Sequence, residues 1–257
     1  MKILCIGDVV GSIGCEFLRK TLPKFKKLKG IDFVICNGEN SADGNGILPT
    51  SAEHLFKSGV DVLTLGNHTF QRKEIFSFLD EEETIVRPCN FPSPSTPGRG
   101  YCTVDLGRTS VTVINLMGQE FIDIKVDNPY YAIDGVLKNI DSKIIVVDMH
   151  AETTSEKKAM GYYLDGRVSA FFGTHTHVQT ADECILKGGT GYITDVGMTG
   201  PVESVLGIKK EIIINRFKTK LPERFENADG ECMLNCILFD IDEKSGKTIS
   251  VERFDLR

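Results

Sequence analysis

The sequence lacks most of the features that mark membrane proteins and nucleic-acid-binding proteins. No apolar run approaches the roughly 20 residues of a membrane-spanning helix, and no charged leader followed by a long apolar stretch is present. The net charge is −6, with 30 Lys and Arg against 36 Asp and Glu, whereas proteins that neutralise nucleic-acid phosphates usually carry a basic excess. We therefore expect no membrane partner and no broad nucleic-acid surface.

Paired cysteines and several common catalytic motifs are also missing. None of the eight cysteines forms a Cys-x-x-Cys pair, which leaves no zinc knuckle. Cys5 and Cys36 lie in apolar, strand-like runs where free thiols pack as small hydrophobic groups, a usage that predicts a cytoplasmic protein. The glycines of residues 7–14 do not form GxGxxG, and GxxxxGK[ST], GxSxG and HExxH do not occur.

What remains is an ordinary globular composition with a regular alternation of elements. The chain has 257 residues, 41% of them hydrophobic and 26% charged, which suits one α/β domain over residues 1–257. A β-α-β-α-β-α order in the first half predicts a parallel sheet covered on both faces. The predicted strands are 3–6, 32–36 and 60–65, and the predicted helices are 13–28, 50–58 and 72–80.

The second half is richer in predicted strands. Segment 208–218 fits a helix and a strand equally well, and Pro23 is expected to kink or split the first helix. The further strands are expected at 101–106, 111–116, 143–148, 168–172, 192–195, 232–241 and 248–254, of which the first two and the last two form hairpins.

Polar side chains recur where the predicted strands end. These strand-end residues are Asp8, Glu39, Asn40, Asn67, His68 and His150. The carboxyl ends of parallel strands lie along one edge of a sheet, where the following loops form a ligand crevice. We therefore expect these side chains to gather at one site.

A histidine pair adds metal-ligand chemistry to this pattern. His175 and His177 flank Thr176, and an extended backbone would direct both imidazoles to the same side. Oxygen and imidazole donors without thiolates suit manganese, iron or zinc. We therefore expect a metal site rather than a structural cysteine–zinc site.

Simpler explanations exist for each residue taken alone. Asp8 and Asn67 are residue types that commonly cap helices, Glu39 fits a surface carboxylate, and His68 fits a structural histidine. Arg167 fits both a contact with a substrate phosphate and an ion pair with a neighbouring acid. The combination of strand-end residues with the histidine pair favours the metal site.

The motifs resemble those of the calcineurin-like metallophosphoesterase superfamily, and more closely its YmdB-like bacterial subfamily. The resemblance covers essentially the whole chain. The matching segments are GDVVGS at 7–12, NGEN at 37–40, GNHTF at 66–70, RPCNFP at 87–92, DMHAETTSEK at 148–157, GTHTHVQTAD at 173–182 and TDVGMTGP at 194–201.

The resemblance implies a fold, a reaction and a set of ligands. The fold is a sandwich of mixed β-sheets flanked by helices, with a dinuclear site at the carboxyl ends of the strands. The implied enzyme is a phosphodiesterase for cyclic nucleotides, notably 2′,3′-cyclic ones, in which a hydroxide bridging two iron or manganese ions attacks phosphorus. A small phosphodiester is thus the expected partner, and an oligomer is compatible with the sequence.

Matching the motifs residue by residue implies a role for each side chain. One metal would be held by Asp8, Glu39 and His177, with Asn40 either a ligand or an outer partner. The other would be held by Glu39, Asn67, His150 and His175. His68 would protonate the leaving oxygen.

The chain departs from the superfamily at two motifs, and these changes recur in the YmdB-like subfamily. The usual DxH is Asp8-Val9-Val10, which lacks a histidine ligand, and Glu39 replaces the usual bridging aspartate. Two other functions remain open to such a site: a phosphatase acting on monoesters or phosphoproteins, and a metal-dependent nucleotide sensor with little turnover.

Overall fold

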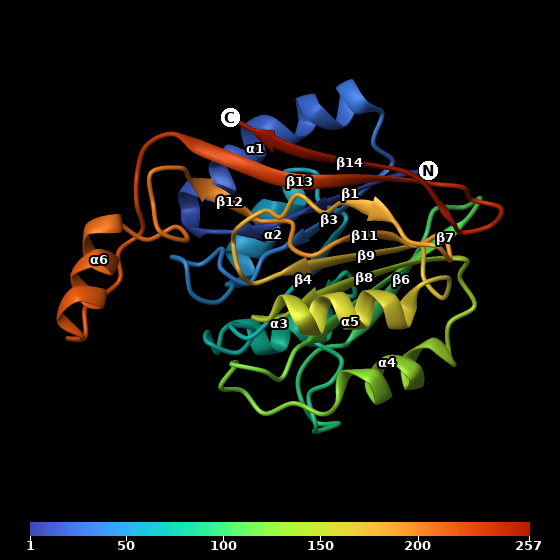
Figure 1. Ribbon diagram of the computed structural model, residues 1–257, viewed down its shortest axis with the longest axis horizontal. Coiled ribbons are helices and arrows are strands. Elements are labelled where there is room, and N and C mark those ends of the chain that lie inside the picture. The colour runs from blue at the N-terminus through green and yellow to red at the C-terminus, as the bar shows by residue number, and fades with distance from the viewer.

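The structure is a computed structural model that describes all 257 residues. Two β-sheets face each other and helices cover their outer faces, so that α1 and α5 lie on opposite sides of the sandwich (Figure 1). The helices are α1 (Gly11–Lys29), α2 (Pro49–Lys57), α3 (Ile75–Glu81), α4 (Pro129–Leu137), α5 (Thr154–Leu164) and α6 (Lys210–Thr219).

Both sheets mix parallel and antiparallel strands. The eight-stranded sheet has the order β2-β12-β13-β1-β3-β4-β5, with β14 also paired to β13, and the six-stranded sheet has the order β10-β11-β9-β8-β7-β6. Strands β1, β3, β4 and β5 are mutually parallel, as are β7, β8, β9 and β11. The expected sandwich of mixed sheets is confirmed.

The strand bounds agree with most of the predicted segments. In the first sheet they are β1 (Lys2–Ile6), β2 (Asp8–Val9), β3 (Phe33–Asn37), β4 (Val62–Thr64), β5 (Ile85–Val86), β12 (Met198–Pro201), β13 (Cys232–Ile241) and β14 (Thr248–Leu256). In the second they are β6 (Tyr101–Asp105), β7 (Ser110–Met117), β8 (Ile144–His150), β9 (Ala170–Thr174), β10 (Cys184–Ile185) and β11 (Gly191–Ile193).

Three apolar cores hold the layers together. One lies between the first sheet and helices α1, α2 and α3, a second lies between the two sheets, and the third lies between the second sheet and helices α4 and α5. The central strands are buried on both faces, which explains why β3 and β8 contain no exposed residue. The parallel sheet is therefore covered by helices on one face and by the other sheet on the opposite face.

Two local predictions are settled by the structure. Helix α1 runs unbroken through Pro23, so the expected split does not occur. Pro23 lies on the exposed side of the helix, where water can hydrate the carbonyl that loses its hydrogen bond. Segment 208–218, which fitted helix and strand equally, contains most of α6. None of the helices combines the length and apolar character that crossing a membrane requires, and all eight cysteines are free.

Candidate metal centre

The strand-end residues meet at one edge of the sandwich. Glu39 lies two residues beyond β3, Asn67 lies three residues beyond β4, and His150 is the last residue of β8. Ligand atoms of Glu39, His150 and His175 all lie within 4.8 Å of one another. The two sheets thus contribute to the same site, because parallel strands from both end at this edge.

The first group of side chains surrounds His150. The Nε2 atom of His150 lies 3.1 Å from Glu39 Oε1 and 2.7 Å from Asn67 Oδ1. Nδ1 of His175 lies 3.0 Å from His150 Nε2. Four donor atoms from four separate segments therefore converge at one point, and they are the four residues expected to share a metal.

The second group comprises Asp8, His177 and Asn40. His177 Nε2 is 3.7 Å from Asp8 Oδ1 and 3.2 Å from the Asn40 amide nitrogen, which also donates to Glu39 Oε1 at 3.4 Å. Glu39 therefore contacts His150 directly and is joined to His177 through the Asn40 amide, a position compatible with a bridging ligand. The amide nitrogen of Asn40, rather than its oxygen, faces His177, so this conformation favours an outer role for Asn40.

His68 stands at the mouth of the site. Its backbone N–H donates to Glu39 Oε2 at 2.8 Å, and its Nδ1 lies 2.7 Å from Asn40 Oδ1. The side chain is 33% exposed, whereas that of Glu39 is 1% exposed. The ring is therefore fixed through Nδ1 while it lines a cavity at the surface of the site.

The backbone that carries the histidine pair differs from the extended strand that was predicted. β9 ends at Thr174, and His175 and His177 have φ values of 98° and 60°, so the segment is not an extended strand. Both rings nevertheless line the same cavity. Asp195 supports this left-handed turn by accepting hydrogen bonds from the Thr176 backbone N–H at 3.2 Å and hydroxyl at 2.7 Å.

A buried polar network that sequence reasoning missed orients His150. Nδ1 of His150 lies 2.9 Å from the Thr174 hydroxyl, which donates to Asp148 Oδ1 at 2.7 Å. Thr64 and Asn37 donate to the other oxygen of Asp148. Outer hydrogen bonds of this kind fix the ring orientation of metal-ligating histidines. The available signal was Asp148 itself, a carboxylate inside an otherwise apolar strand.

A second missed element is the fully buried ion pair of Lys157 and Asp195. Lys157 Nζ donates to Asp195 Oδ2 at 2.7 Å and to the Thr174 carbonyl at 3.1 Å. Lys157 lies on the buried side of helix α5, whose first turn is capped by Thr153 accepting from the Glu156 N–H. The pair therefore ties α5 to the turn that carries both histidines.

Glu152 is a third missed residue, and it belongs to the mouth of the site. Its carboxylate is 3.0 Å from His175 Nε2, and its side chain is 49% exposed and lines the cavity. His175 thus has one ring nitrogen directed at His150 and the other at a carboxylate, an arrangement that fixes the tautomer of a metal-binding imidazole.

Burial and charge shape the ionisation of the site. Burial alone would raise the pKa of Glu39, but the facing His150 outweighs it and lowers the pKa to about 2. Burial raises the pKa of Asp8 well above its usual value, and burial together with His150 lowers the pKa of His175 to about 3. Glu39 is thus an ionised carboxylate and His175 a neutral imidazole, the forms that bind metals. Burial would lower the pKa of His150, but Glu39 and Asp8 outweigh it and raise the pKa to about 9, so this ring must lose a proton when a metal binds.

The side chains present fit a divalent metal centre. Asp8 Oδ1 is buried without any hydrogen-bond partner, which is costly for a carboxylate unless a cation compensates it. The donors are carboxylate, amide and imidazole groups, and no thiolate is among them. Neither Asp8 nor Asn67 caps a helix, because the residues at the N-cap positions of α1 and α3 are Val10 and Glu74.

Arg167 lies away from this cluster, which corrects the expectation of a substrate contact. It precedes β9, whereas the site follows the opposite end of that strand. Its guanidinium forms a 2.6 Å ion pair with Asp134 and lies 4.9 Å from the Tyr163 ring centroid. The ion pair with a neighbouring acid, the other explanation of Arg167, is therefore the one observed.

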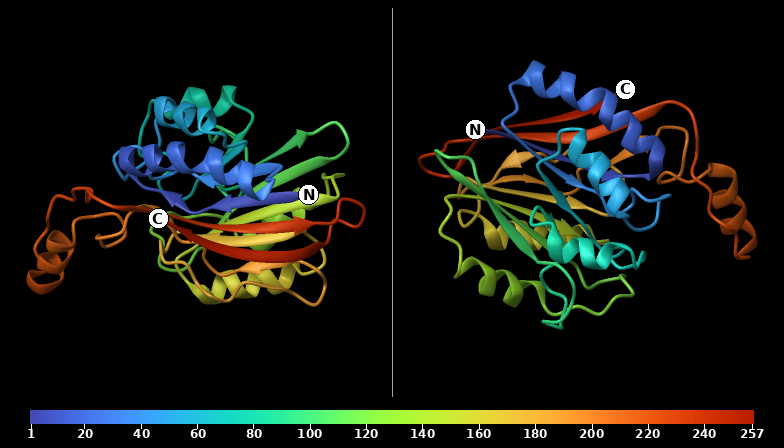
Figure 2. Two further views of the ribbon diagram at one scale, coloured as in Figure 1. Left: turned by 90° about the horizontal axis from the view of Figure 1, so that it is seen from above. Right: turned by 180° about the vertical axis from the view of Figure 1, so that it is seen from behind.

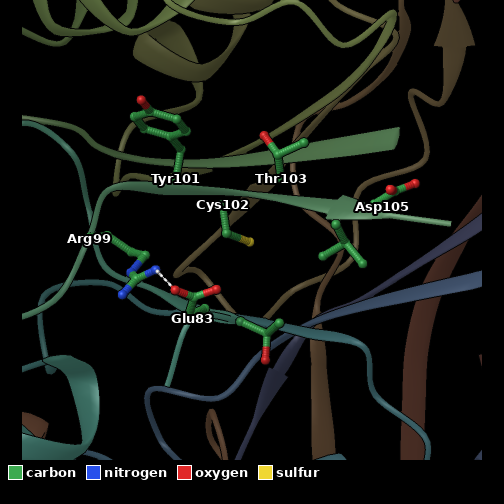
Figure 3. A pocket seen from close by; sticks show the side chains of 8 residues that line it. Glu83, Arg99, Tyr101, Cys102, Thr103 and Asp105 are labelled. Carbon is green, nitrogen blue, oxygen red and sulfur yellow. Dashed lines mark ion pairs between the residues drawn. The ribbon is translucent and has the colours of Figure 1, made fainter. Parts of the chain in front are cut away.

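Cavity size alone points to a different place. A cavity of about 640 Å³ lies beside β6 and contains an ion pair of Arg99 and Glu83 at 3.3 Å (Figure 3). It borders the outermost strands of both sheets and holds no cluster of metal-ligating side chains. The cavity over the cluster is about 300 Å³, within the range of roughly 300–1,000 Å³ usual for small-molecule sites, and its donor chemistry makes it the candidate functional site.

Comparison with known proteins identifies relatives along nearly the whole chain. A family model described as YmdB-like protein matches residues 4–254. The chain is 48% identical over 255 residues to a Bacillus subtilis (strain 168) protein named 2′,3′-cyclic-nucleotide 2′-phosphodiesterase, covering 98% of this chain and 96% of the relative.

Two solved structures share the fold at similar coverage. A hypothetical protein from Thermus thermophilus is 39% identical, with a TM-score of 0.93 over 99% of this chain and 98% of the other. A protein from Mycoplasma pneumoniae described as a novel phosphatase is 34% identical, with a TM-score of 0.95 over 100% of this chain and 93% of the other.

Proposed function

The chain belongs to the YmdB-like family, and from that premise we propose that it is a metal-dependent phosphodiesterase that hydrolyses cyclic nucleotides, 2′,3′-cyclic ones in particular. The relative from Bacillus subtilis, 48% identical over 98% of this chain, supports the substrate class. The observation that carries the proposal is Glu39, whose Oε1 contacts His150 directly and accepts a hydrogen bond from the Asn40 amide that also faces His177.

We assign two metal ions to these two groups. Glu39, Asn67, His150 and His175 would hold one, and Asp8, His177 and again Glu39 would hold the other. The oxygen and imidazole donors suit iron or manganese and also accept zinc. When bound, such ions supply an activated water and neutralise charge on the phosphate. The buried, unpartnered oxygen of Asp8 supports a cation on its side of the site.

The protein's own contribution to proton transfer centres on His68. Asn40 Oδ1 accepts a hydrogen bond from His68 Nδ1, so the other ring nitrogen is left to face the substrate. From that nitrogen a proton passes to the ribose oxygen as its bond to phosphorus breaks. The link from the His68 backbone to Glu39 holds this acid at a fixed position beside the cluster.

The test is product analysis on a panel of phosphate esters with manganese-loaded protein. We expect turnover of 2′,3′-cyclic nucleotides to exceed that of 3′,5′-cyclic nucleotides and of p-nitrophenyl phosphate. The strained five-membered ring is the easier diester to open, and the relative's name points to release of a 3′-monophosphate. About two metal ions per chain should be found by elemental analysis.

The controls separate the proposal from its alternatives. Arg167→Ala, which alters an arginine remote from the cluster, should retain full activity. Preference for the monoester would instead make the protein a phosphatase, and absence of turnover with a full complement of metal would make it a binding protein. Either result would overturn the proposed reaction.

A further inference from the structure

Residues 202–231 form an arm that leaves β12 and returns at β13. Its helix α6 projects from the rest of the molecule in all three ribbon views (Figures 1 and 2), and Ile213 is its one buried residue. Because the helix projects, apolar side chains on it stay exposed to water instead of being buried. The arm therefore calls for a role other than packing the core.

The base of the arm is held in a defined shape. The Ala228 N–H donates to the Gly207 carbonyl at 2.9 Å, and the Lys209 N–H donates to the Glu226 carbonyl at 3.0 Å. A β-bridge also joins Ile208 to Asn227. These bonds pair the outgoing and returning segments, so the residues between the helix and the body keep a fixed relation to the site.

The arm contacts the metal-ligand cluster directly. His177 Nδ1 lies 3.1 Å from the carbonyl oxygen of Leu206, and Leu206 adopts a left-handed conformation with φ of 56°. The arm's backbone therefore orients one of the proposed metal ligands. This contact places the base of the arm at the edge of the cavity rather than at a distance from the chemistry.

The same segment adds three of the four hydrophobic side chains that line the cavity. Leu206, Ile208 and Phe225 line the cavity together with Glu39 and His68. We call these three apolar residues the wall, and the buried donors beneath them the floor. Leu206 and Phe225 are each 45% exposed, and the Arg216 guanidinium lies 4.9 Å from the Phe225 ring centroid, which steadies the ring by a cation–π contact.

We propose that the wall is a nucleobase subsite in which Phe225 stacks on the base while the floor engages the cyclic phosphate. This inference rests on the proposed function, since it supplies the part of a nucleotide that a metal centre does not recognise. An aromatic ring stacks on every base, and Leu206 and Ile208 offer no side-chain hydrogen bonds to base edges. The subsite should therefore favour nucleotides over base-free cyclic phosphates and discriminate little among bases.

The experiment compares Phe225→Ala with wild type on two substrates that share a five-membered cyclic phosphate. Adenosine 2′,3′-cyclic phosphate carries a base, and glycerol 1,2-cyclic phosphate does not. Loss of one base–aromatic stack lowers affinity by roughly 5- to 100-fold, so KM for the nucleotide should rise by that factor while kcat changes little. Kinetics on the glycerol ester should be unchanged. Phe225→Tyr should restore the nucleotide KM.

Phe217→Ala is the matched control, because Phe217 lies on α6, is 66% exposed and does not line the cavity. It should behave as wild type on both substrates. Inhibition by free adenosine gives a second measurement, and it should weaken in Phe225→Ala alone. Metal content and thermal midpoint, measured on each variant, confirm that the floor is intact.

The outcomes separate this inference from the proposed function. Equal efficiency of wild type on the two esters, unaffected by Phe225→Ala, would overturn the base subsite and leave the phosphodiesterase standing. Failure of wild type on both esters would overturn the phosphodiesterase itself. An equal loss on both esters in Phe225→Ala would also reject the subsite, since it would show that Phe225 supports the floor rather than the base.

Discussion

The floor and the wall of one cavity are built on opposite principles. Asp8, Glu39 and His150 are at most 1% exposed and are held by strands from the two sheets. Leu206 and Phe225 are nearly half exposed and come from a single excursion of the chain. The floor buries charge that water would otherwise solvate, whereas the wall leaves in water apolar surface that other parts of the molecule bury.

Each arrangement is unfavourable for folding alone and becomes useful when a ligand is bound. Buried carboxylates need a compensating cation, and an exposed apolar cluster beside a cavity marks a binding surface. We therefore assign the phosphate of a bound nucleotide to the floor and its base to the wall. Substitutions in the floor should therefore affect every substrate, and substitutions in the wall should affect only some.

The largest expected effect comes from Glu39→Ala, which removes the carboxylate proposed to bridge the two metals. Both metals should be lost, and activity should fall below detection on every phosphodiester. Metal content and turnover are measured on the same preparation. Asp8→Ala and His150→Ala are the comparison variants, and each should weaken metal retention on a different side. Full activity with two metals in Glu39→Ala would show that it does not bridge.

The next largest effect is expected from His68→Ala, which alters the rim of the floor without removing a proposed ligand. Loss of a positioned acid costs roughly 10²–10⁴-fold in rate, and the loss should be smaller on bis-p-nitrophenyl phosphate because p-nitrophenolate leaves without a proton. Metal content should stay at wild-type level. Metal loss in this variant would instead identify His68 as a ligand.

Lys157 lies beneath the floor, and we expect Lys157→Met to lower the free energy of unfolding more than it changes the reaction rate. The substitution leaves Asp195 buried without its cation, and breaking a buried pair in this way costs roughly 3–5 kcal/mol. Denaturant unfolding of the metal-loaded protein measures it. The double variant Lys157→Met with Asp195→Asn should recover part of the loss, because it removes the unpaired charge. No recovery would mean that Asp195 matters for the Thr176 turn and not for the pair.

The smallest effect comes from Asp182, which belongs to neither region. Burial would raise its pKa, but hydrogen bonds from Thr194 and Thr180 outweigh that effect and lower it. A lowered folded pKa gives stability that is fully present above the ordinary value of about 3.9 and is lost as pH falls through the folded value.

Asp182→Asn should therefore lower the free energy of unfolding by about 1 kcal/mol at neutral pH. The difference from wild type should shrink below about pH 3.9, which urea unfolding across that range would reveal. Lys158→Ala, which removes the 3.7 Å ion pair to Asp182, should have less effect. A difference that grows in acid would show that the hydrogen bonds do not favour the carboxylate.

The sequence predicted the floor far better than the wall. Asp8, Glu39, Asn67 and His150 could be placed because parallel topology brings strand ends to one edge whatever the details of the loops. Phe225 gave no such signal, because it lies in a segment without periodicity. Its approach to the cavity depends on the pairing of the arm's two segments, such as the hydrogen bond from Ala228 to Gly207, which no local pattern encodes.

Predictions of local backbone geometry failed where tertiary contacts determine that geometry. The left-handed turn at His175 depends on Asp195, which is 20 residues away in the sequence. The continuity of α1 through Pro23 depends on which side of the helix faces water. Arg167 fitted a phosphate contact and an ion pair equally well, because its position relative to the ends of β9 was not known.

The bond between the Leu206 carbonyl and His177 connects the arm to a proposed metal ligand, and we expect this contact to link the two thermodynamically. A ligand that holds Leu206 in the conformation that accepts from His177 favours the imidazole orientation that binds metal. Linkage is reciprocal in free energy, so a metal bound at His177 would favour the Leu206 conformation that accepts from it by the same amount. Metal supply would then set how well the protein holds the base of a nucleotide, in addition to how fast it cleaves the phosphate.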